Sequence, residues 1–306
     1  MSTVYTLNGK VLKNSANDKW LIKKEADPYN PNPLNLPANT VRVRTNDGNV
    51  PIKDSDTTYE TATLVSGTTD VYDVYKSGTD FTSMFRNSTN ITEVLGANTT
   101  NVTEMSHMFD NCSALTTVPL FDTSNVEVMG DMFSNCTSLT TVPLFDTSNV
   151  TYMNGMFGYC SALTSVPLFD TSNVADIGYM FNECTSLTTV PLFDTSNVWN
   201  MSGMFRYCTS LTSVPLFDTS NVTDISYMFR NCTSLTTVPL FDTSKVTNMN
   251  GMFRDCTNVE SGALALYQQA STQTNPPSNH SYTFYSCGSN TTTGAAELAQ
   301  IPSSWK

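Results

Sequence analysis

PLFDTS, first written at residues 119–124, recurs five more times at an unvarying interval of 24 residues. The later copies occupy residues 143–148, 167–172, 191–196, 215–220 and 239–244. Around each copy runs a longer unit, MF-x-x-C-[ST]-x-L-T-x-V-PLFDTSNV. A strict period in this range is typical of repeat proteins, in which each unit leaves an apolar face that only the next unit covers. The spacing therefore predicts an extended array of stacked coils.

One half of the unit predicts a strand. CTSLTTVPL contains the pattern L-x-x-V-x-L, for example at Leu139, Val142 and Leu144, which is similar to the strand signature of leucine-rich repeats. Pro143 has no N–H to donate to a sheet ladder. We therefore expect a parallel sheet that is short and irregular at this point.

The other half predicts a helical turn. In NVTDISYMFRNC, the apolar residues Val222, Ile225, Phe229 and Cys232 lie three and four positions apart, which is the spacing of a helical stripe that faces a core. The fold class predicted from both halves is an α/β repeat protein, a leucine-rich-repeat-type solenoid with a short parallel sheet.

The flanks of the array differ from it in composition. Residues 1–80 are expected to form a small β-rich region, with a hairpin at Asn8-Gly9, a second hairpin over 41–52 and a Pro-rich connector at 28–37. The repeats are assigned to residues 81–257, beginning with a degenerate copy, as expected of a terminal repeat. Residues 258–306 form the predicted C-terminal cap and tail. In this cap, NVESGALALYQQAST favours a short helix.

Charge and hydropathy exclude several classes of partner. The net charge is -12 with only 15 Lys and Arg residues, so the clustered cations that nucleic acid requires are missing. No apolar run approaches the roughly 18 residues of a membrane span. The opening MSTVYTLNGKVLK lacks the apolar core of a secretory signal. We expect no nucleic-acid binding and no membrane insertion, and export, if it occurs, by an unconventional route.

Seven of the eight cysteines follow the period of the repeat. A column of small buried thiols is the favoured interpretation, because side chains at equivalent positions run parallel rather than toward each other. Disulfides between adjacent coils are the alternative, since the coils lie within disulfide range. Cys287 stands outside the column and could be free.

Two polar columns accompany the cysteines. The aspartates of PLFDTS repeat every 24 residues, as Asp146 and Asp170 do. Each can accept backbone N–H groups two residues on, as an Asx turn, or the column can hold calcium; the ligand pattern of calcium-binding repeats is absent. The asparagines of DTSN form a second column that ends at Lys245. We expect these amides to point inward and to satisfy the backbone of the neighbouring coil.

Catalysis finds little support in the sequence. Only His107 and His280 are available to a Ser-His-Asp or Cys-His arrangement, and His107 occupies a variable position that favours solvent exposure. No Gly-rich phosphate loop, HExxH or paired-Cys pattern occurs. We predict that the protein is not an enzyme and uses no cofactor or metal ion.

Comparison of the copies within the chain identifies candidate binding residues. The PLFDTSNV segment scarcely changes, whereas the two residues after Met-Phe and four sites before the next pair vary. Several of these sites carry Tyr, Trp or Arg, the residue types enriched at binding hot spots. The alternative is relaxed constraint on a solvated surface. The candidates are Tyr152, Tyr159, Tyr179, Trp199, Arg206, Tyr207, Tyr227, Arg230 and Arg254.

The repeats resemble the BspA-like leucine-rich repeats of bacterial surface proteins, which carry similar FDTSNVTDMSxMFxxC segments. The resemblance covers roughly residues 81–257, although the unit here is shorter through the PLF segment. The whole layout, with its LNGK-like start, its NPLNLP connector and its ESGALALYQQA ending, is similar to repeat proteins of gut bacteriophages and prophages. For such proteins the resemblance implies a virion-associated or host-recognition role.

These observations together predict a non-enzymatic binding module, phage-encoded, that presents a repetitive surface to a host-surface protein or glycan. The invariant Thr, Pro and Phe of the strand segment offer a second, uniform surface for a repetitive ligand. One alternative is a structural virion component that contacts other subunits through residues 1–80. A bacterial cell-surface adhesin is another, so the expected location is the virion or, failing that, the cell surface.

Overall fold

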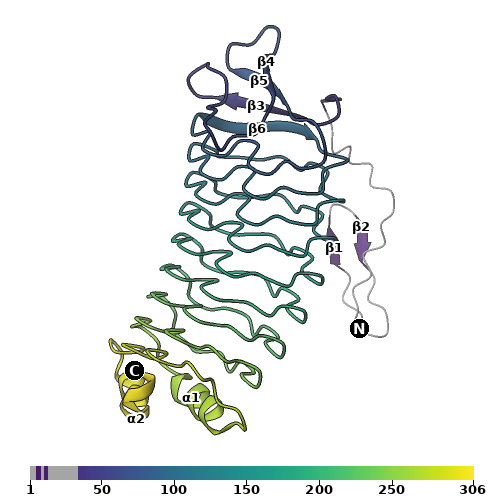
Figure 1. Cartoon of the computed structure of the whole chain (residues 1–306). Coiled ribbons are helices and arrows are strands. Elements are labelled where there is room, and N and C mark those ends of the chain that lie inside the picture. The colour runs from purple at the N-terminus through teal and green to yellow at the C-terminus, as the bar shows by residue number, and fades with distance from the viewer. Residues whose placement is uncertain (1–4, 8–9, 13–33) are drawn as a thin grey trace. The chain divides into compact units, whose positions relative to one another are not determined.

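A computed structural model describes residues 5–7, 10–12 and 34–306, which fall into two units, residues 1–30 and 31–306 (Figure 1). In the first unit, strand β1 (Tyr5–Leu7) pairs antiparallel with β2 (Lys10–Leu12). This pairing agrees with the predicted first hairpin. Its turn at Asn8-Gly9 and most of the Pro-rich connector, residues 28–33, lie outside the described residues.

The second unit begins with a four-stranded antiparallel sheet in the order β4-β5-β3-β6. The strands are β3 (Thr40–Thr45), β4 (Thr61–Leu64), β5 (Val71–Tyr75) and β6 (Ile91–Asn98). The alternation VRVR correctly indicates β3, whose valines are buried. The hairpin predicted over 41–52 is wrong, however, because β3 pairs with β5 and β6, which lie much further along the chain.

Strand β6 belongs to the first, degenerate repeat and joins the sheet to the array. It forms a long strand that pairs with β3, with a bulge at Leu95, the position where later repeats have proline. Toward the array, the N–H of Val94 donates to the carbonyl of Thr117 at 3.2 Å. The departure of this copy from the repeat therefore has a structural cause, since one edge of the copy pairs with β3.

The later repeats stack as successive coils (Figure 1). Each coil is bonded to the next through its backbone: the N–H of Phe157, for example, donates to the carbonyl of Met180 at 2.9 Å, and Phe181 donates to Met204 at 2.9 Å. Isolated parallel bridges such as Tyr152↔Asp176 connect the same coils. The predicted short parallel sheet is wrong, because the extended sheet of the protein is antiparallel and the coils share only single bridges.

The predicted helical turn in each repeat is also wrong. Its residues form consecutive tight turns, in which the N–H of Met228 donates to the carbonyl of Ile225 at 3.3 Å, three residues back. The intervening N–H of Tyr227 donates instead to Asn250 of the next coil at 2.8 Å. A helix needs every N–H for its own i−4 carbonyl. Tyr227 also has a φ of 57°, in the left-handed region, which interrupts a right-handed helix.

In the PLF segment, the leucine and phenylalanine side chains point in directions opposite to those predicted. Leu144 is 46% exposed, whereas Phe145 is 2% exposed and lies in the core. Phe145 therefore takes the core position that the leucine-rich pattern assigned to Leu144. The predicted uniform surface of Thr, Pro and Phe is accordingly wrong for Phe, and exposed leucines replace it.

Stacked phenylalanines and a column of thiols form the core of the array. The ring centroid of Phe157 lies 5.9 Å from that of Phe133 and 5.8 Å from that of Phe181, in both cases nearly parallel. The Cys160 thiol donates to the carbonyl of Phe133 at 3.1 Å. All eight cysteines are free and buried, which confirms the thiol column and excludes the disulfide alternative in this structure.

The C-terminal cap contains one more coil, which the strict period concealed. Phe253 donates its N–H to the carbonyl of Thr283 at 2.8 Å, and the rings of Phe253 and Phe284 stack at 6.1 Å. Cys287 therefore continues the column rather than standing outside it. The sequence reads SYTFYSC at this point, with Thr283 in place of Met, and it follows after 31 residues instead of 24.

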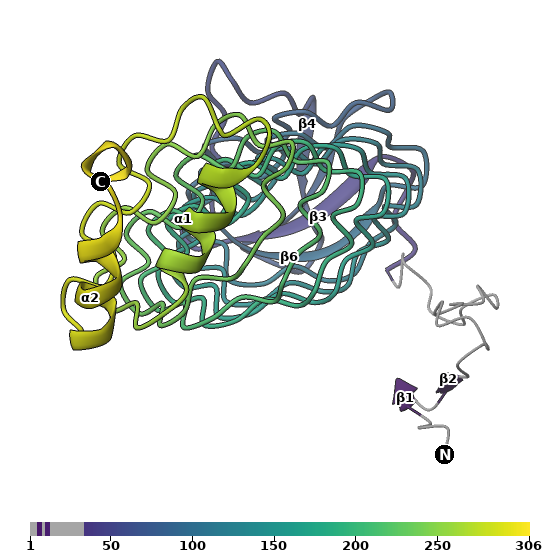
Figure 2. The same cartoon turned by 90° about the horizontal axis from the view of Figure 1, so that it is seen from below.

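The longer interval accommodates the helix that the sequence predicted, α1 (Ala263–Thr272), and α2 (Thr292–Gln300) follows the extra coil. Figures 1 and 2 show both helices at the end of the stack opposite the sheet. Glu297 of α2 accepts from the N–H of Leu264 at 3.1 Å, so the second helix helps to fix the start of the first. A short 3-10 helix, η1 (Ser303–Trp305), ends the chain and buries Trp305.

The thiol column makes the stability of the fold sensitive to alkali. Burial raises the pKa of Cys160 to about 12, whereas an unfolded thiol has a pKa of about 8.5. Below about pH 8.5 this thiol is protonated in both the folded and the unfolded chain, and its contribution to stability is fully present. As the pH rises toward 12, the thiol ionises in the unfolded chain only, and this contribution is lost. The free energy of unfolding is measured by urea titration under reducing conditions at several pH values. Between about pH 9 and 11, we expect it to fall less steeply with pH in Cys160→Ala than in the wild type, by about 1.4 kcal/mol per pH unit. Equal slopes for the two proteins would contradict this prediction.

Candidate binding surface

The variable positions of the repeat gather on one side of the coils. We define the Tyr/Arg face as the side chains one residue before and two and three residues after each repeat methionine. Seven of the nine candidate residues belong to it: Tyr159, Tyr179, Arg206, Tyr207, Tyr227, Arg230 and Arg254. The first and last of these positions have left-handed backbone, with φ values of 57° at Tyr179 and 60° at Tyr207. The tight turns, rather than a helix, therefore place these residues.

Arginine and tyrosine side chains contact one another from coil to coil along this face. The guanidinium of Arg206 lies 5.0 Å from the ring centroid of Tyr207. Arg230 lies between Tyr207 and Tyr227, at 5.8 and 5.7 Å from their centroids. A cation near an aromatic face is attracted to the ring, which restricts the positions of both side chains. The face is thus an ordered array of cations and aromatic rings.

The face extends into the extra coil, beyond the residues that the sequence identified. Arg254 lies 5.2 Å from the ring of Tyr282 and 5.3 Å from the ring of Tyr285. Both tyrosines are exposed. They were missed because their coil is offset and lacks the Met-Phe pair; the shared FxxC pattern of SYTFYSC is the signal that identifies them.

Two tyrosines of the face, each one residue before a repeat methionine, lie against a glycine of the next coil. A Cβ added at Gly203 would lie 2.4 Å from the Tyr179 ring, and one added at Gly251 would lie 2.8 Å from the Tyr227 ring. Both glycines also have positive φ. The alternation of tyrosine and glycine at this position, visible in the sequence, therefore reflects one ring lying over the neighbouring repeat.

The other two candidates occupy other rows. Tyr152 lies four residues before Met156, on the line of parallel bridges that continues through Asp176. Trp199 lies five residues before Met204, in the row that carries Thr103 and Thr151 in earlier coils. Both are exposed. The structure does not place Trp199 on the Tyr/Arg face.

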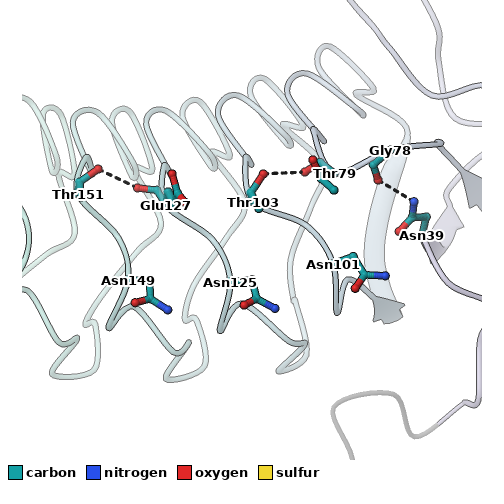
Figure 3. Close-up of a pocket in the computed structure, with 9 residues that line it drawn as sticks. All are labelled: Asn39, Gly78, Thr79, Asn101, Thr103, Asn125, Glu127, Asn149 and Thr151. Atoms are coloured by element: carbon teal, nitrogen blue, oxygen red, sulfur yellow. Dashed lines mark hydrogen bonds between the residues drawn. The ribbon is translucent and has the colours of Figure 1, made fainter.

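A polar groove of about 850 Å³ follows the first coils (Figure 3). Asn101, Asn125 and Asn149 form one row, and Thr103 and Thr151 lie in the other. The Asn125 amide donates to the carbonyl of Thr100 at 2.8 Å, which confirms that the asparagines satisfy the neighbouring backbone. They are exposed rather than inward, however, because the carbonyls they bond lie at the surface of the coil.

The aspartate column serves the turns. Asp170 accepts from the backbone N–H of Ser172 at 3.1 Å and from its hydroxyl at 2.7 Å, as the Asx-turn interpretation predicts. The same bonds hold the pKa of Asp218 below its usual range, with Ser220 as donor. Within residues 34–306, no group of three or more acidic, His or Cys side chains is arranged to hold a metal ion.

The two histidines contact a carboxylate and an aromatic ring. His107 lies 3.4 Å from Asp110, which raises the pKa of the imidazole, and its side chain is partly exposed. His280 stacks on Trp305 with ring centroids 4.2 Å apart, and its Nδ1 lies 3.2 Å from the carbonyl of Ser304.

Among the helices described here, none is long and apolar enough for a membrane crossing.

Comparisons with known proteins point to a repeat family. The model of the family described as "Mycoplasma protein of unknown function, DUF285" matches residues 79–190, 162–265 and 186–290. A leucine-rich repeat protein from Eubacterium ventriosum is 21% identical, with a TM-score of 0.33 over 56% of this chain and 53% of that protein. A leucine-rich repeat protein from Bacteroides ovatus is 17% identical, with a TM-score of 0.21 over 74% of this chain and 83% of that protein. The chain thus spans about half the length of the first. A search of curated proteins found no match.

Proposed function

Since this chain belongs to the family described as Mycoplasma protein of unknown function, DUF285, we propose that its repeats are a non-enzymatic binding module. In this proposal the array acts as a leucine-rich-repeat-type solenoid, phage-encoded and carried on the virion, and the Tyr/Arg face contacts a host-surface protein or glycan. The membership itself supports only a repeat protein, so the proposal rests on the surface.

The ordered row of arginines and tyrosines is the observation that carries the proposal. Arg206, Arg230 and Arg254 are three of only 15 basic residues in a chain of net charge -12, yet they occupy the same position in successive coils. Each lies near at least one tyrosine ring. Tyrosine and arginine are enriched among the few hot-spot residues that carry most of the energy of protein interfaces, and side chains that are already ordered lose less conformational entropy on binding.

The Tyr/Arg face is tested by replacing Tyr227 and Arg230 together with serine. The labelled 306-residue chain is titrated onto whole cells from a panel of gut bacteria, and attachment is measured by flow cytometry. We expect the apparent affinity to fall about 30-fold or more, as for a hot-spot pair. Thermal stability should change little, because the left-handed position of Tyr227 is occupied by Ser83 in the first repeat.

Leu216→Ser is the matched variant, because it removes a side chain that is also exposed but lies on the PLF segment. It should attach like the wild type. Wild-type attachment by the Tyr227 and Arg230 variant would exclude the Tyr/Arg face. If only Leu216→Ser lost attachment, the exposed leucines of the PLF segments would be the binding surface instead.

The leucine row supports a second candidate, a structural virion component that packs against other subunits. Five exposed leucines follow one another at the period of the repeat, and uniform apolar rows of this kind mark contact surfaces. These residues are Leu144, Leu168, Leu192, Leu216 and Leu240. Incorporation of Leu216→Ser into particles, compared with incorporation of the Tyr227 and Arg230 variant, separates the two candidates.

A further inference from the structure

A hollow of about 370 Å³ interrupts the Tyr/Arg face in the middle of the array. It exists because Gly158 stands two residues after Met156, where other repeats carry Arg, Asn, Ser or Asp. A Cβ added at Gly158 would lie 3.3 Å from the carbonyl oxygen of Gly155, a close contact, and its φ is not in the left-handed region. The same turn carries Asn182 and Arg206 in the following repeats, so a small backbone shift accommodates larger residues there. The volume lies at the lower end of the range of small-ligand sites.

The hollow is lined by carboxylates and amides from neighbouring coils. Asp176 accepts from the N–H of Gly178 at 2.8 Å and from the amide of Asn200 at 3.0 Å, which fixes the orientation of its carboxylate. Asn182 is only 3% exposed, and its Oδ1 has no hydrogen-bond partner within the described part of the chain. A buried amide oxygen without a donor is costly, and a ligand hydroxyl that reaches it after a small rotation of the side chain removes that cost.

Two aromatic rings complete the lining. Tyr159 and Tyr179 are 41% and 40% exposed, and they come from successive coils. Arg206 also lines the hollow, and its Nε likewise has no hydrogen-bond partner among residues 34–306. Apolar ring faces therefore lie beside hydrogen-bonding groups of both polarities within one small concave site.

We propose that this hollow binds a neutral pyranose sugar, as one unit of a surface glycan. A pyranose has an apolar C–H face for the tyrosine rings and hydroxyls that both donate and accept, which suits Asp176 and Arg206 together. A phosphate or a sulfate would meet the carboxylates of Asp131 and Asp176. A purely apolar ligand would leave the lining amides without partners. The inference deepens the proposed function and rests on it.

The variant Gly158→Arg tests the site with a residue that the chain itself uses at this position, as at Arg206 and Arg230. The probes are glucose, galactose, mannose and N-acetylglucosamine as their methyl glycosides, titrated into the full chain and followed by ligand-observed NMR. We expect at least one of them to bind the wild type with a Kd of about 1 mM, and Gly158→Arg to weaken it about tenfold or more. Thr140→Arg adds the same charge at an exposed site outside the hollow and should bind like the wild type.

Absence of binding by all four glycosides would overturn the inference, and so would equal binding by wild type and Gly158→Arg. Circular dichroism and the unfolding midpoint establish that Gly158→Arg is folded; if it is not, Gly158→Asn, with the residue found at Asn182, replaces it. Cell attachment is measured in parallel. If the Tyr227 and Arg230 variant loses attachment but no glycoside binds, only the sugar site is contradicted. If that variant attaches like the wild type, the Tyr/Arg face itself is contradicted.

Discussion

Replacing Phe157 by alanine is expected to lower the free energy of unfolding by about 3–5 kcal/mol, the cost of deleting a buried aromatic ring. Phe157 is fully buried, and its ring stacks on those of Phe133, Phe169 and Phe181. The surrounding coils cannot collapse into the space, because their spacing is set by backbone hydrogen bonds such as that from Phe157 to Met180. Urea unfolding monitored by circular dichroism measures the change.

Leu168→Ala is the comparison for this prediction, because Leu168 comes from the invariant PLF segment but is 57% exposed. We expect it to change the unfolding free energy by no more than about 0.5 kcal/mol. Similar losses for the two variants would contradict the assignment of the core. If the array unfolds in more than one step, the transition that Phe157→Ala shifts identifies the coils that unfold with it.

Gly262→Ala is expected to destabilise the C-terminal cap by about 2–5 kcal/mol. Gly262 precedes α1 with a φ of 97°, which costs an L-residue about 1–2 kcal/mol. In addition, the new Cβ would lie 2.3 Å from the backbone carbonyl oxygen of Val238, and that carbonyl cannot rotate away as a side chain would. Forced overpacking of this kind costs about 1–3 kcal/mol more.

Gly67→Ala separates the two contributions. Gly67 has a φ of 82°, but a Cβ there would meet nothing within 4 Å, so this variant experiences only the backbone strain. We expect a loss of about 1–2 kcal/mol. Hydrogen exchange of α1 amides reports the effect of Gly262→Ala locally. Equal losses at the two glycines would show that the close approach to Val238 has no energetic consequence.

The internal comparison of repeats located much of the candidate surface, because the positions that vary between copies are not those of the buried Met, Phe and Cys side chains that stacking requires. Seven of its nine residues share the Tyr/Arg face. The comparison missed Tyr282 and Tyr285, because α1 lengthens the interval before their coil and a comparison at a fixed period does not include it. The comparison also missed the hollow at Gly158. A missing side chain has meaning only when the neighbouring coils that surround it are known.

The amino-acid sequence was enough to predict the repeat, the thiol column, the Asx turns and the helix α1, because each depends on local chemistry or on a strict period. The remaining features depend on contacts between parts of the chain that are distant in sequence. The apolar spacing around Tyr227 suits a helix, yet alternate N–H groups donate to the next coil and leave a chain of tight turns. In the same way β3 finds its partners in β5 and β6, and Phe145 rather than Leu144 enters the core, because these choices depend on which backbone and which coil lies alongside.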